Sequence, residues 1–436
     1  MSLLETLLDI SEARREAIPE RSRYMARLSL FDWLVCGRAG RTEPVAEKLR
    51  AFAAQEGGRG SASVIAGGMA PARLAALVNG ATSHALDYDD THFAHVGHLS
   101  VGIYPAALAA GEAEGAGMSD VMDAFLLGAE CAIRVGLSLG AEHYSLGFHQ
   151  TATAGAFGAT VAVGRLMGLD RTRMAAAIAL CSTRASGLKS QFGTMGKPYN
   201  AGMAASNGIE CASLASLGMT SCVDGLEGQQ AFLATHTTHS GEDVRPAGIY
   251  LFDENSYKFH ACCHGTHAMI EALLAIRERR GEELKDITAV RVATNPRWMR
   301  VCNIPVPSTG LEVKFSYRWL AGMALSGHRT GSDRVFTDAL ATDPGLSEFA
   351  DRVNVIEDSG LTDEQCDCSI TYADGTEERM FHDLAGQDVE NLEPKLRRKA
   401  EAMLGRDVGD LKAILDRGDD LTAADIGRLC RFPETL

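Results

Sequence analysis

Apolar residues recur at helical spacing along much of the first 250 residues of this chain. In ERSRYMARLSLFDWLVCGR, for example, Met25, Leu28 and Phe31 fall on one face of a helix. Another helix is predicted over PVAEKLRAFAAQEGG, which a pair of glycines ends. Later segments such as TATAGAFGATVAVGRLMGLD are rich in alanine and glycine and carry hardly any strand signal. We therefore expect this part of the chain to be all-helical.

A polar stretch, SHALDYDDTHFAHVGHLSVGIYP, interrupts the helical pattern between Ser83 and Pro105. The residues before it predict a buried helix, and IYPAALAAGEAEG predicts the next one, with Pro105 in its first turn. Farther along, a long apolar helix is predicted over MSDVMDAFLLGAECAIRVGLSLG, with Ser119 as its N-cap. The polar stretch is therefore expected to end one helix and to form the loop into the next.

The pattern changes after Lys258, where strand signals join the helical ones. GTHAMIEALLAIRERRG predicts an amphipathic helix, whereas DITAVRVATN and RVNVIED predict strands. CSITYADGTEERMFH predicts a hairpin whose turn is Asp374-Gly375, and FSYRWLAGMALSG and PKLRRKAEAML are again helical. The tail, LKAILDRGDDLTAADIGRLCRF, returns to helix and is expected to dock on the first domain.

The predicted fold is mainly α, a large all-helical domain with an inserted smaller α+β domain. We place the all-helical domain at residues 1–264 plus 400–436 and the α+β domain at residues 265–399. The length of 436 residues agrees with about two domains.

Composition narrows the class of protein. Hydrophobic residues make up 46% and charged residues 23%, as in a soluble globular protein. The formal net charge of -15, with no basic block, argues against nucleic acid or an anionic membrane as a partner. The 11 cysteines are scattered, and neither Cys262-Cys263 nor Cys366-x-Cys368 has the spacing of a zinc or iron–sulfur site. With no signal peptide or spanning segment expected, we predict a cytoplasmic protein with reduced thiols.

The polar stretch concentrates groups that titrate near neutral pH on a loop, where chemistry is often found. Its three carboxylates, four imidazoles and one hydroxyl are Asp87, Asp89, Asp90, His84, His92, His95, His98 and Thr91. The alternative is a solvated polar loop whose histidines have no function. The spacing His92-x-x-His95-x-x-His98 also suggests a metal site, but no further ligand motif accompanies it, so we expect no metal.

Further candidates follow in three segments. GFHQTATAGAFG places His149 just before a helix N-terminus, where the helix dipole lowers the pKa of an imidazole, and Tyr144 precedes it. RASGLKSQFGTMGKPYNAG carries Arg184, Lys189 and Lys197 among glycines. The proline after Lys197 is expected to stop any helix through it, leaving a cation in a glycine-rich loop that suits a carboxylate. Arg184 and Lys189 are alternatively ordinary surface charges.

The last segment, KFHACCHGTHAM, places Lys258, His260 and His264 at the predicted domain boundary, where ligand clefts tend to form.

Four segments together resemble the MmgE/PrpD family in their order and separation. They are LDYDDTH…GHLSVGIYPAALAAGEAEG, GFHQTATAGAFGA, GTMGKPYNAGMAASNGIECASLASLG and KFHACCHGTHAMIEAL. The resemblance extends over nearly the whole chain. It implies a helical domain with an inserted α+β domain, a homodimer, and activity without metal or organic cofactor. The family includes 2-methylcitrate dehydratase, cis-aconitate decarboxylase and iminodisuccinate epimerase.

Carried over onto this sequence, the pocket positions of the family fall on Asp87, Thr91, His98, His149, Lys197 and Lys258. Two positions differ from the family pattern. Leu99 follows Gly97-His98 where many members have proline, and Trp319 takes a place often held by tyrosine. The second difference prevents the substrate of any one member from being carried over directly.

The reactions of the family share the removal of a proton or a carboxylate at a carbon next to a carboxylate. Such a carbanion needs cations and hydrogen-bond donors around its oxygens. The resemblance thus implies Lys197, Lys258 and Thr91 as substrate-binding residues, and the glycine-rich segment adds Lys189 and Arg184 as further candidates. His98 and His149 would exchange protons, Asp87 would orient or tune a histidine, and Tyr144 would act from the opposite face.

The reaction expected first is epimerisation of a small di- or polycarboxylate, similar to that of iminodisuccinate epimerase. A hydro-lyase of the 2-methylcitrate dehydratase type is the next alternative, and a cis-aconitate-type decarboxylase is the third. From a different class, the chain is a non-catalytic helical dimer that binds a metabolite. The expected partner is a small carboxylate.

Overall fold

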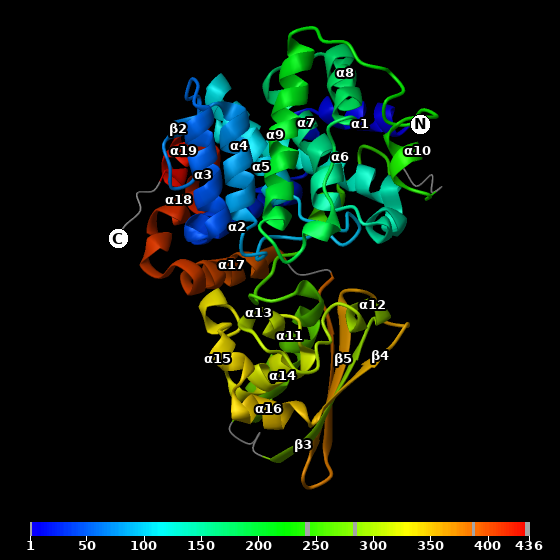
Figure 1. Cartoon of the computed structure of the whole chain (residues 1–436), viewed down its shortest axis with the longest axis vertical. Coiled ribbons are helices and arrows are strands. Elements are labelled where there is room, and N and C mark those ends of the chain that lie inside the picture. Colours follow the sequence, from blue (N-terminus) through cyan, green and yellow to red (C-terminus); the bar gives the residue numbers. More distant parts are fainter. Residues whose placement is uncertain (1, 240–244, 282–285, 386–388, 432–436) are drawn as a thin grey trace. The chain divides into compact units, whose positions relative to one another are not determined.

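The fold was derived from a computed structural model that describes residues 2–239, 245–281, 286–385 and 389–431 (Figure 1). Contacts between residues divide the chain into two compact units. The first consists of Met1–Tyr257 and Leu404–Leu436, and the second of Lys258–Met403. Each unit has its own core, and the structure is mainly α-helical, as predicted.

The first unit is a bundle of helices that the C-terminal end of the chain rejoins (Figure 1). Its helices are α1 (Leu3–Ser11), α2 (Glu20–Ala39), α3 (Pro44–Glu56), α4 (Ala72–Ser83), α5 (Ser100–Glu114), α6 (Met118–Leu146), α7 (Gln150–Leu166), α8 (Arg171–Cys181), α9 (Gly196–Ser216), α10 (Phe232–His236), α18 (Lys412–Arg417) and α19 (Ala423–Cys430). One detail differs from the prediction, because β1 (Ala62–Ser63) pairs antiparallel with β2 (Met69–Ala70). Strands of two residues are too short to show an alternating pattern in the sequence.

Small residues allow the central helices of this unit to pack closely. Helix α7 is buried from Gln150 to Gly164 on every side. A Cβ atom on Gly202 of α9 would lie 2.2 Å from the carbonyl oxygen of Leu77 in α4, so only glycine allows this backbone contact. The many alanines and glycines of the sequence thus allow these helices to lie close together, and the helices in turn position the loop after α4.

Three helix boundaries were predicted wrongly. Gly117, not Ser119, is the N-cap of α6, and the Ser119 hydroxyl accepts a hydrogen bond from Arg15 instead. Helix α5 begins at Ser100, so Pro105 lies inside it rather than in its first turn. Helix α9 begins at Gly196 and runs through Pro198. Proline is tolerated there because the first-turn N–H groups of a helix have no intrahelical partner.

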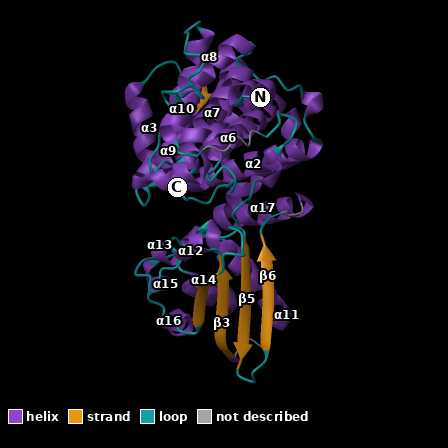
Figure 2. Ribbon diagram, turned by 90° about the vertical axis from the view of Figure 1, so that its right-hand side faces the viewer, coloured by secondary structure: helices purple, strands orange, loops and turns teal. Residues whose placement is uncertain are grey.

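The second unit is built on a four-stranded sheet in the order β4-β3-β5-β6 (Figure 2). Strands β3 (Ile287–Thr294) and β4 (Val353–Glu357) are parallel, whereas β5 (Gln365–Tyr372) is antiparallel to β3 and to β6 (Glu377–Asp383). Gly375 has a φ of 82° in the β5–β6 turn, which confirms the predicted Asp374-Gly375 hairpin. The helices are α11 (His267–Arg280), α12 (Pro296–Met299), α13 (Gly310–Val313), α14 (Tyr317–Ser326), α15 (Asp338–Ala341), α16 (Pro344–Ala350) and α17 (Val389–Leu404).

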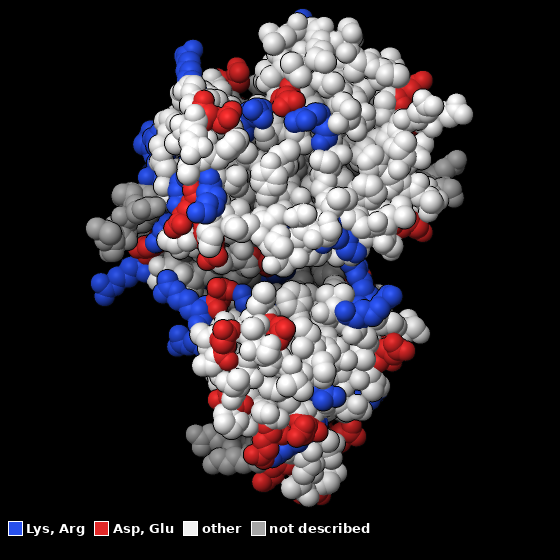
Figure 3. Space-filling view, in the orientation of Figure 1, with Lys and Arg blue, Asp and Glu red and all other residues white. Residues whose placement is uncertain are grey.

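The surface charge, the most apolar helix and the cysteines can each be compared with the class of protein that the sequence predicts. On the face of the molecule in Figure 3, acidic and basic side chains are interspersed rather than segregated. Helix α6 is long and apolar enough to cross a membrane, but 78% of its most apolar window is buried inside the protein. A buried core helix can be equally long and apolar, so α6 is weak evidence for a membrane span.

All eleven cysteines are free thiols, as expected.

Candidate active site

The predicted polar loop connects α4 to α5 and is fixed in place at several points. Thr91 exchanges two backbone hydrogen bonds of 2.8 Å with Ser256. Asp90 is fully buried and accepts hydrogen bonds from the Ser100 hydroxyl at 2.5 Å and from the Asn255 amide at 2.8 Å. Burial raises the pKa of Asp90 above its ordinary value. The loop is therefore an ordered part of the core, and the alternative of a solvated polar loop is wrong.

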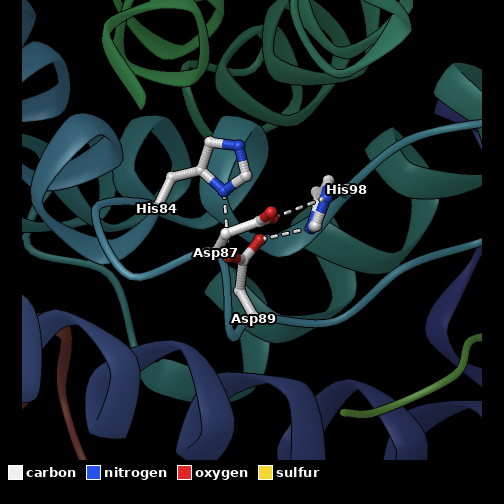
Figure 4. A group of neighbouring side chains, drawn as sticks. All are labelled: His84, Asp87, Asp89 and His98. Atoms are coloured by element: carbon white, nitrogen blue, oxygen red, sulfur yellow. Dashed lines mark hydrogen bonds and ion pairs between the residues drawn. The ribbon is translucent and has the colours of Figure 1, made fainter. Parts of the chain in front are cut away.

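Four side chains of this loop form one cluster (Figure 4). Asp89 lies between two imidazoles, with one oxygen 2.9 Å from His84 Nδ1 and the other 2.7 Å from His98 Nδ1. The second nitrogen of His98, Nε2, is 3.4 Å from Asp87 Oδ1. Asp87 has a φ of 52°, a left-handed conformation that Asp adopts more readily than most residues, and this turns its carboxylate toward His98.

The cluster keeps Asp89 ionised although water does not reach it. Burial by itself raises the pKa of Asp89, but the charges and hydrogen bonds of His84 and His98 hold that pKa well below its ordinary value. His98 is flanked by carboxylate oxygens at both ring nitrogens, which is the environment of an imidazolium. A proton donor is thus available at His98 Nε2.

Lys197 extends the cluster from the first turn of α9. Its Nζ lies 2.6 Å from the second oxygen of Asp87 and 5.3 Å from the centre of the Phe192 ring. The side chain is 17% exposed. An ammonium group has three donors, so Lys197 can hold Asp87 and still bind a carboxylate of a ligand.

His149 is the N-cap residue of α7, as the sequence predicted. Its ring lies 6.1 Å from that of His84, and its Nδ1 is 3.2 Å from the Asn200 amide nitrogen, which also donates to the Leu188 carbonyl. Asn200 thus donates to Nδ1, which leaves the ring proton on Nε2. Burial, with the nearby positive charges, holds the pKa of His149 well below its ordinary value. His149 is therefore a neutral hydrogen-bond donor at neutral pH, and its predicted role in proton exchange stays a prediction.

Tyr144 and Lys189 contact each other on segments next to His149. The Lys189 ammonium lies 3.5 Å from the centre of the Tyr144 ring and donates to its backbone carbonyl at 2.9 Å. Arg184 instead pairs with Glu210 at 3.1 Å and donates to Asn207. These contacts assign the side chains of Lys189 and Arg184 to partners within the protein, and their predicted role in substrate binding stays a prediction.

The two other histidines of the loop do not converge with His98. His92 Nε2 is 2.9 Å from the Leu251 carbonyl, and His95 Nδ1 is 3.1 Å from the Ala132 carbonyl. Burial lowers the pKa of His92 to about 4 and that of His95 to about 3, so both are neutral. One ring nitrogen of each therefore faces a backbone carbonyl, and the expectation that no metal binds at the His92/His95/His98 spacing stays a prediction.

A different set, His84, Asp87, Asp89 and His98, has potential ligand atoms within 4.8 Å of one another. The short contacts of this set place its imidazole nitrogens against carboxylate oxygens, and Lys197 already supplies a positive charge to Asp87. The donors therefore fit a proton-carrying network at least as well as they fit a cation.

Sequence reasoning left three residues of this site without a role. His84 and Asp89 stand in the polar stretch, but nothing in their spacing shows that one carboxylate bridges two imidazoles. Asn200 lies one turn after Lys197 on α9, and only the folded contact with His149 reveals it. A helical wheel starting at Gly196 could have placed Asn200 on the face of Lys197.

Lys258 is the first residue of the second unit and is buried there, as are His260 and His264. His260 contacts Thr330 at 2.6 Å and Glu271 at 3.3 Å. Trp319, the departure from the family pattern, is buried in α14. The predicted substrate-binding roles of Lys258 and Thr91 stay predictions.

Comparison with known proteins agrees with the resemblance seen in the sequence. The model of the MmgE/PrpD N-terminal domain matches residues 10–244, and that of the MmgE/PrpD C-terminal domain matches residues 260–416. Cis-aconitate decarboxylase of Mus musculus is 27% identical over 391 residues, which cover 83% of this chain and 79% of that protein. Cis-aconitate decarboxylase of Aspergillus terreus is 30% identical over 283 residues, which cover 61% of this chain and 57% of that protein.

Proposed function

Because this chain belongs to the MmgE/PrpD family of enzymes, we propose that it is a lyase that decarboxylates a small unsaturated polycarboxylate of the cis-aconitate type. The observation that carries the proposal is the cluster in which His98 lies between Asp87 and Asp89 while Lys197 holds the other oxygen of Asp87. The cis-aconitate decarboxylases among its relatives favour this substrate class.

Decarboxylation of such an acid requires the protein to stabilise the developing negative charge and to protonate carbon. When the C–C bond to the leaving carboxylate breaks, its electron pair spreads over the allylic carbons and the remaining carboxylates. Cations and neutral donors stabilise that charge, and an acid must then protonate carbon. Six carbons enter as cis-aconitate, and one CO2 and a five-carbon unsaturated dicarboxylate leave.

Side chains of the first unit are suited to stabilise this charge and to donate the proton. Lys197 would bind a substrate carboxylate with the donors that Asp87 does not use, and His149 would donate from Nε2. His98 would deliver the proton from Nε2, the nitrogen nearest Asp87. Thr91 is proposed to hold another carboxylate, and the substrate-binding role of Lys258, which the family resemblance implies, stays a prediction.

Epimerisation, the reaction expected first from the sequence, draws no support from these relatives. It requires a second acid on the opposite face of the substrate, a role given to Tyr144. The contacts found for Tyr144 place its ring under the Lys189 ammonium. Decarboxylation, which the sequence ranked third, is therefore the better-supported reaction.

The test is to incubate the protein with cis-aconitate, citrate, 2-methylcitrate and iminodisuccinate in deuterated water and to follow proton NMR. We expect CO2 release from cis-aconitate and one deuterium on carbon in a five-carbon product. Water loss from 2-methylcitrate would move the assignment to a hydro-lyase, and stereoisomer exchange in iminodisuccinate without CO2 release would restore the epimerase. A homodimer in the cytoplasm without metal or organic cofactor also stays a prediction.

A further inference from the structure

Asp89 is shared between two imidazoles at the centre of the cluster (Figure 4). The side chains of Asp89 and His84 are fully buried, and that of His98 is 10% exposed. Each oxygen of Asp89 therefore faces one imidazole nitrogen, and the Asp89 side chain is not exposed to solvent. A buried carboxylate is stable in this form only while both partners donate to it.

His84 faces Asp89 with Nδ1, while its Nε2 is buried and has no hydrogen-bond partner among the residues that the structure describes. His84 therefore contacts the cluster through Nδ1, which lies 2.9 Å from Asp89 Oδ1. Its ring lies edge-on to that of His98 at 4.6 Å.

His98 differs from His84 because carboxylate oxygens face both of its nitrogens. With His98 as an imidazolium, two cations (His98 and Lys197) balance two carboxylates (Asp87 and Asp89) in this buried cluster. Among the described residues, further titratable groups that act on the cluster are His149 before α7 and, on the loop itself, His95 and Asp90. Burial lowers the pKa of both histidines and raises the pKa of Asp90, so each of the three is shifted toward its neutral form.

We propose that His84 and Asp89 are positioning residues, which together hold His98 as an imidazolium whose Nε2–H faces the exposed side of the cluster. That side is marked by Asp87, whose side chain is 36% exposed. In the reaction, which rests on the proposed function, the N–H bond at Nε2 breaks as the C–H bond of the product forms. His98 becomes neutral, keeps the proton on Nδ1, the nitrogen that faces Asp89, and regains the other proton from water.

The proposal predicts that two substitutions move the titration of His98 in opposite directions. Asp89→Asn removes a negative charge at 2.7 Å, so the imidazolium loses stability and the midpoint falls by about one pH unit or more. His84→Phe removes the donor to Asp89, so the carboxylate attracts the His98 proton more strongly and the midpoint rises. His84→Gln restores a donor and returns the midpoint close to that of the wild type.

The measurement is 15N NMR of the imidazole nitrogens in the full chain without substrate, with the His98 signals assigned from their loss in His98→Gln. Thermal melting of each variant verifies that it is folded. Mere loosening of the site would move both variants the same way, toward an exposed histidine. Shifts of the same sign, or no shift in either folded variant, would show that the two residues do not position His98.

An activity measurement separates this proposal from the proposed function. If wild-type protein decarboxylates cis-aconitate, Asp89→Asn should lower kcat about tenfold or more at neutral pH with little change in KM. The alkaline limit of kcat should move in the same direction as the NMR midpoint in both variants. If the wild type does not decarboxylate any acid tested, the proposed function is wrong, whereas the NMR titration still decides whether His84 and Asp89 position His98.

Discussion

Lys197 combines a fixed partner with unused hydrogen-bond capacity. Asp87 holds its ammonium at 2.6 Å, and the side chain still reaches the surface. We predict that Lys197→Met lowers kcat/KM by about 10²-fold or more, because a cation that stabilises charge developing in the transition state is lost. The measurement is steady-state CO2 release from cis-aconitate.

The matched control for this variant is Lys48→Met, which removes an exposed lysine from α3. It should leave kcat/KM unchanged and the melting temperature close to that of the wild type. Equal losses in both variants would mean that Lys197 acts through net charge or folding rather than at the site.

The four-residue cluster makes a definite prediction about metal removal. Both imidazole Nδ1 atoms face Asp89 oxygens, and Lys197 supplies the positive charge beside Asp87. Dialysis against EDTA should therefore leave the decarboxylase rate unchanged within error. Loss of activity on dialysis with recovery on addition of Zn²⁺ would instead identify His84, Asp87, Asp89 and His98 as a metal site.

From the sequence alone, a residue could be recognised as a functional candidate only where its neighbours in the chain are unusual. Lys197 stands among glycines and next to proline, and His149 precedes a helix, so both attract attention as residues. Asp89 has no such neighbours, and its importance lies in two distances that arise on folding. The pairing of Arg184 with Glu210 is likewise invisible in the sequence, since 26 residues separate them.

Helix packing sets the position of the site loop, because α4 leads directly into it. Gly202 of α9 lies against the backbone of Leu77, and an added Cβ would be 2.2 Å from its carbonyl oxygen. We predict that Gly202→Ala lowers the free energy of unfolding by about 1–3 kcal/mol through overpacking. Chemical denaturation measures this loss, and kcat should fall with it.

Gly155 of α7 offers the matched control, since an added Cβ there would meet only Ala204 Cβ, at 3.8 Å. Gly155→Ala should be tolerated and should raise the free energy of unfolding by about 0.5–1 kcal/mol, because alanine loses less backbone entropy in a helix. Equal destabilisation by both substitutions would contradict the argument from close packing at Gly202.

Element types were easier to predict than element boundaries. The β5–β6 hairpin was found because Asp374-Gly375 dictates a tight turn between alternating strands. The start of α9 was missed because proline blocks a helix only beyond its first turn, and the sequence does not show where that turn lies. Ser119 was a good cap by composition, but its hydroxyl contacts Arg15 instead.

The path of the whole chain leaves the helical unit and returns to it. Arg38 of α2 is only 4% exposed and donates to Asp410 at 2.6 Å and to the carbonyls of Asp407 and Leu429. The tail also pairs Leu421 with Met118 through the backbone. The second unit, in contrast, is one continuous segment, Lys258–Met403.

This topology predicts opposite outcomes for two truncated proteins. A chain of residues 1–403 should lose the cooperative unfolding of the helical unit, because it lacks the buried side chains of α18 and α19 and the Asp410 partner of Arg38. A chain of residues 258–403 should keep its sheet, since all four strands lie within it. Circular dichroism melts of both proteins provide the comparison. A cooperative helical melt of 1–403 equal to that of the full chain would show that the returning tail does not stabilise the first unit.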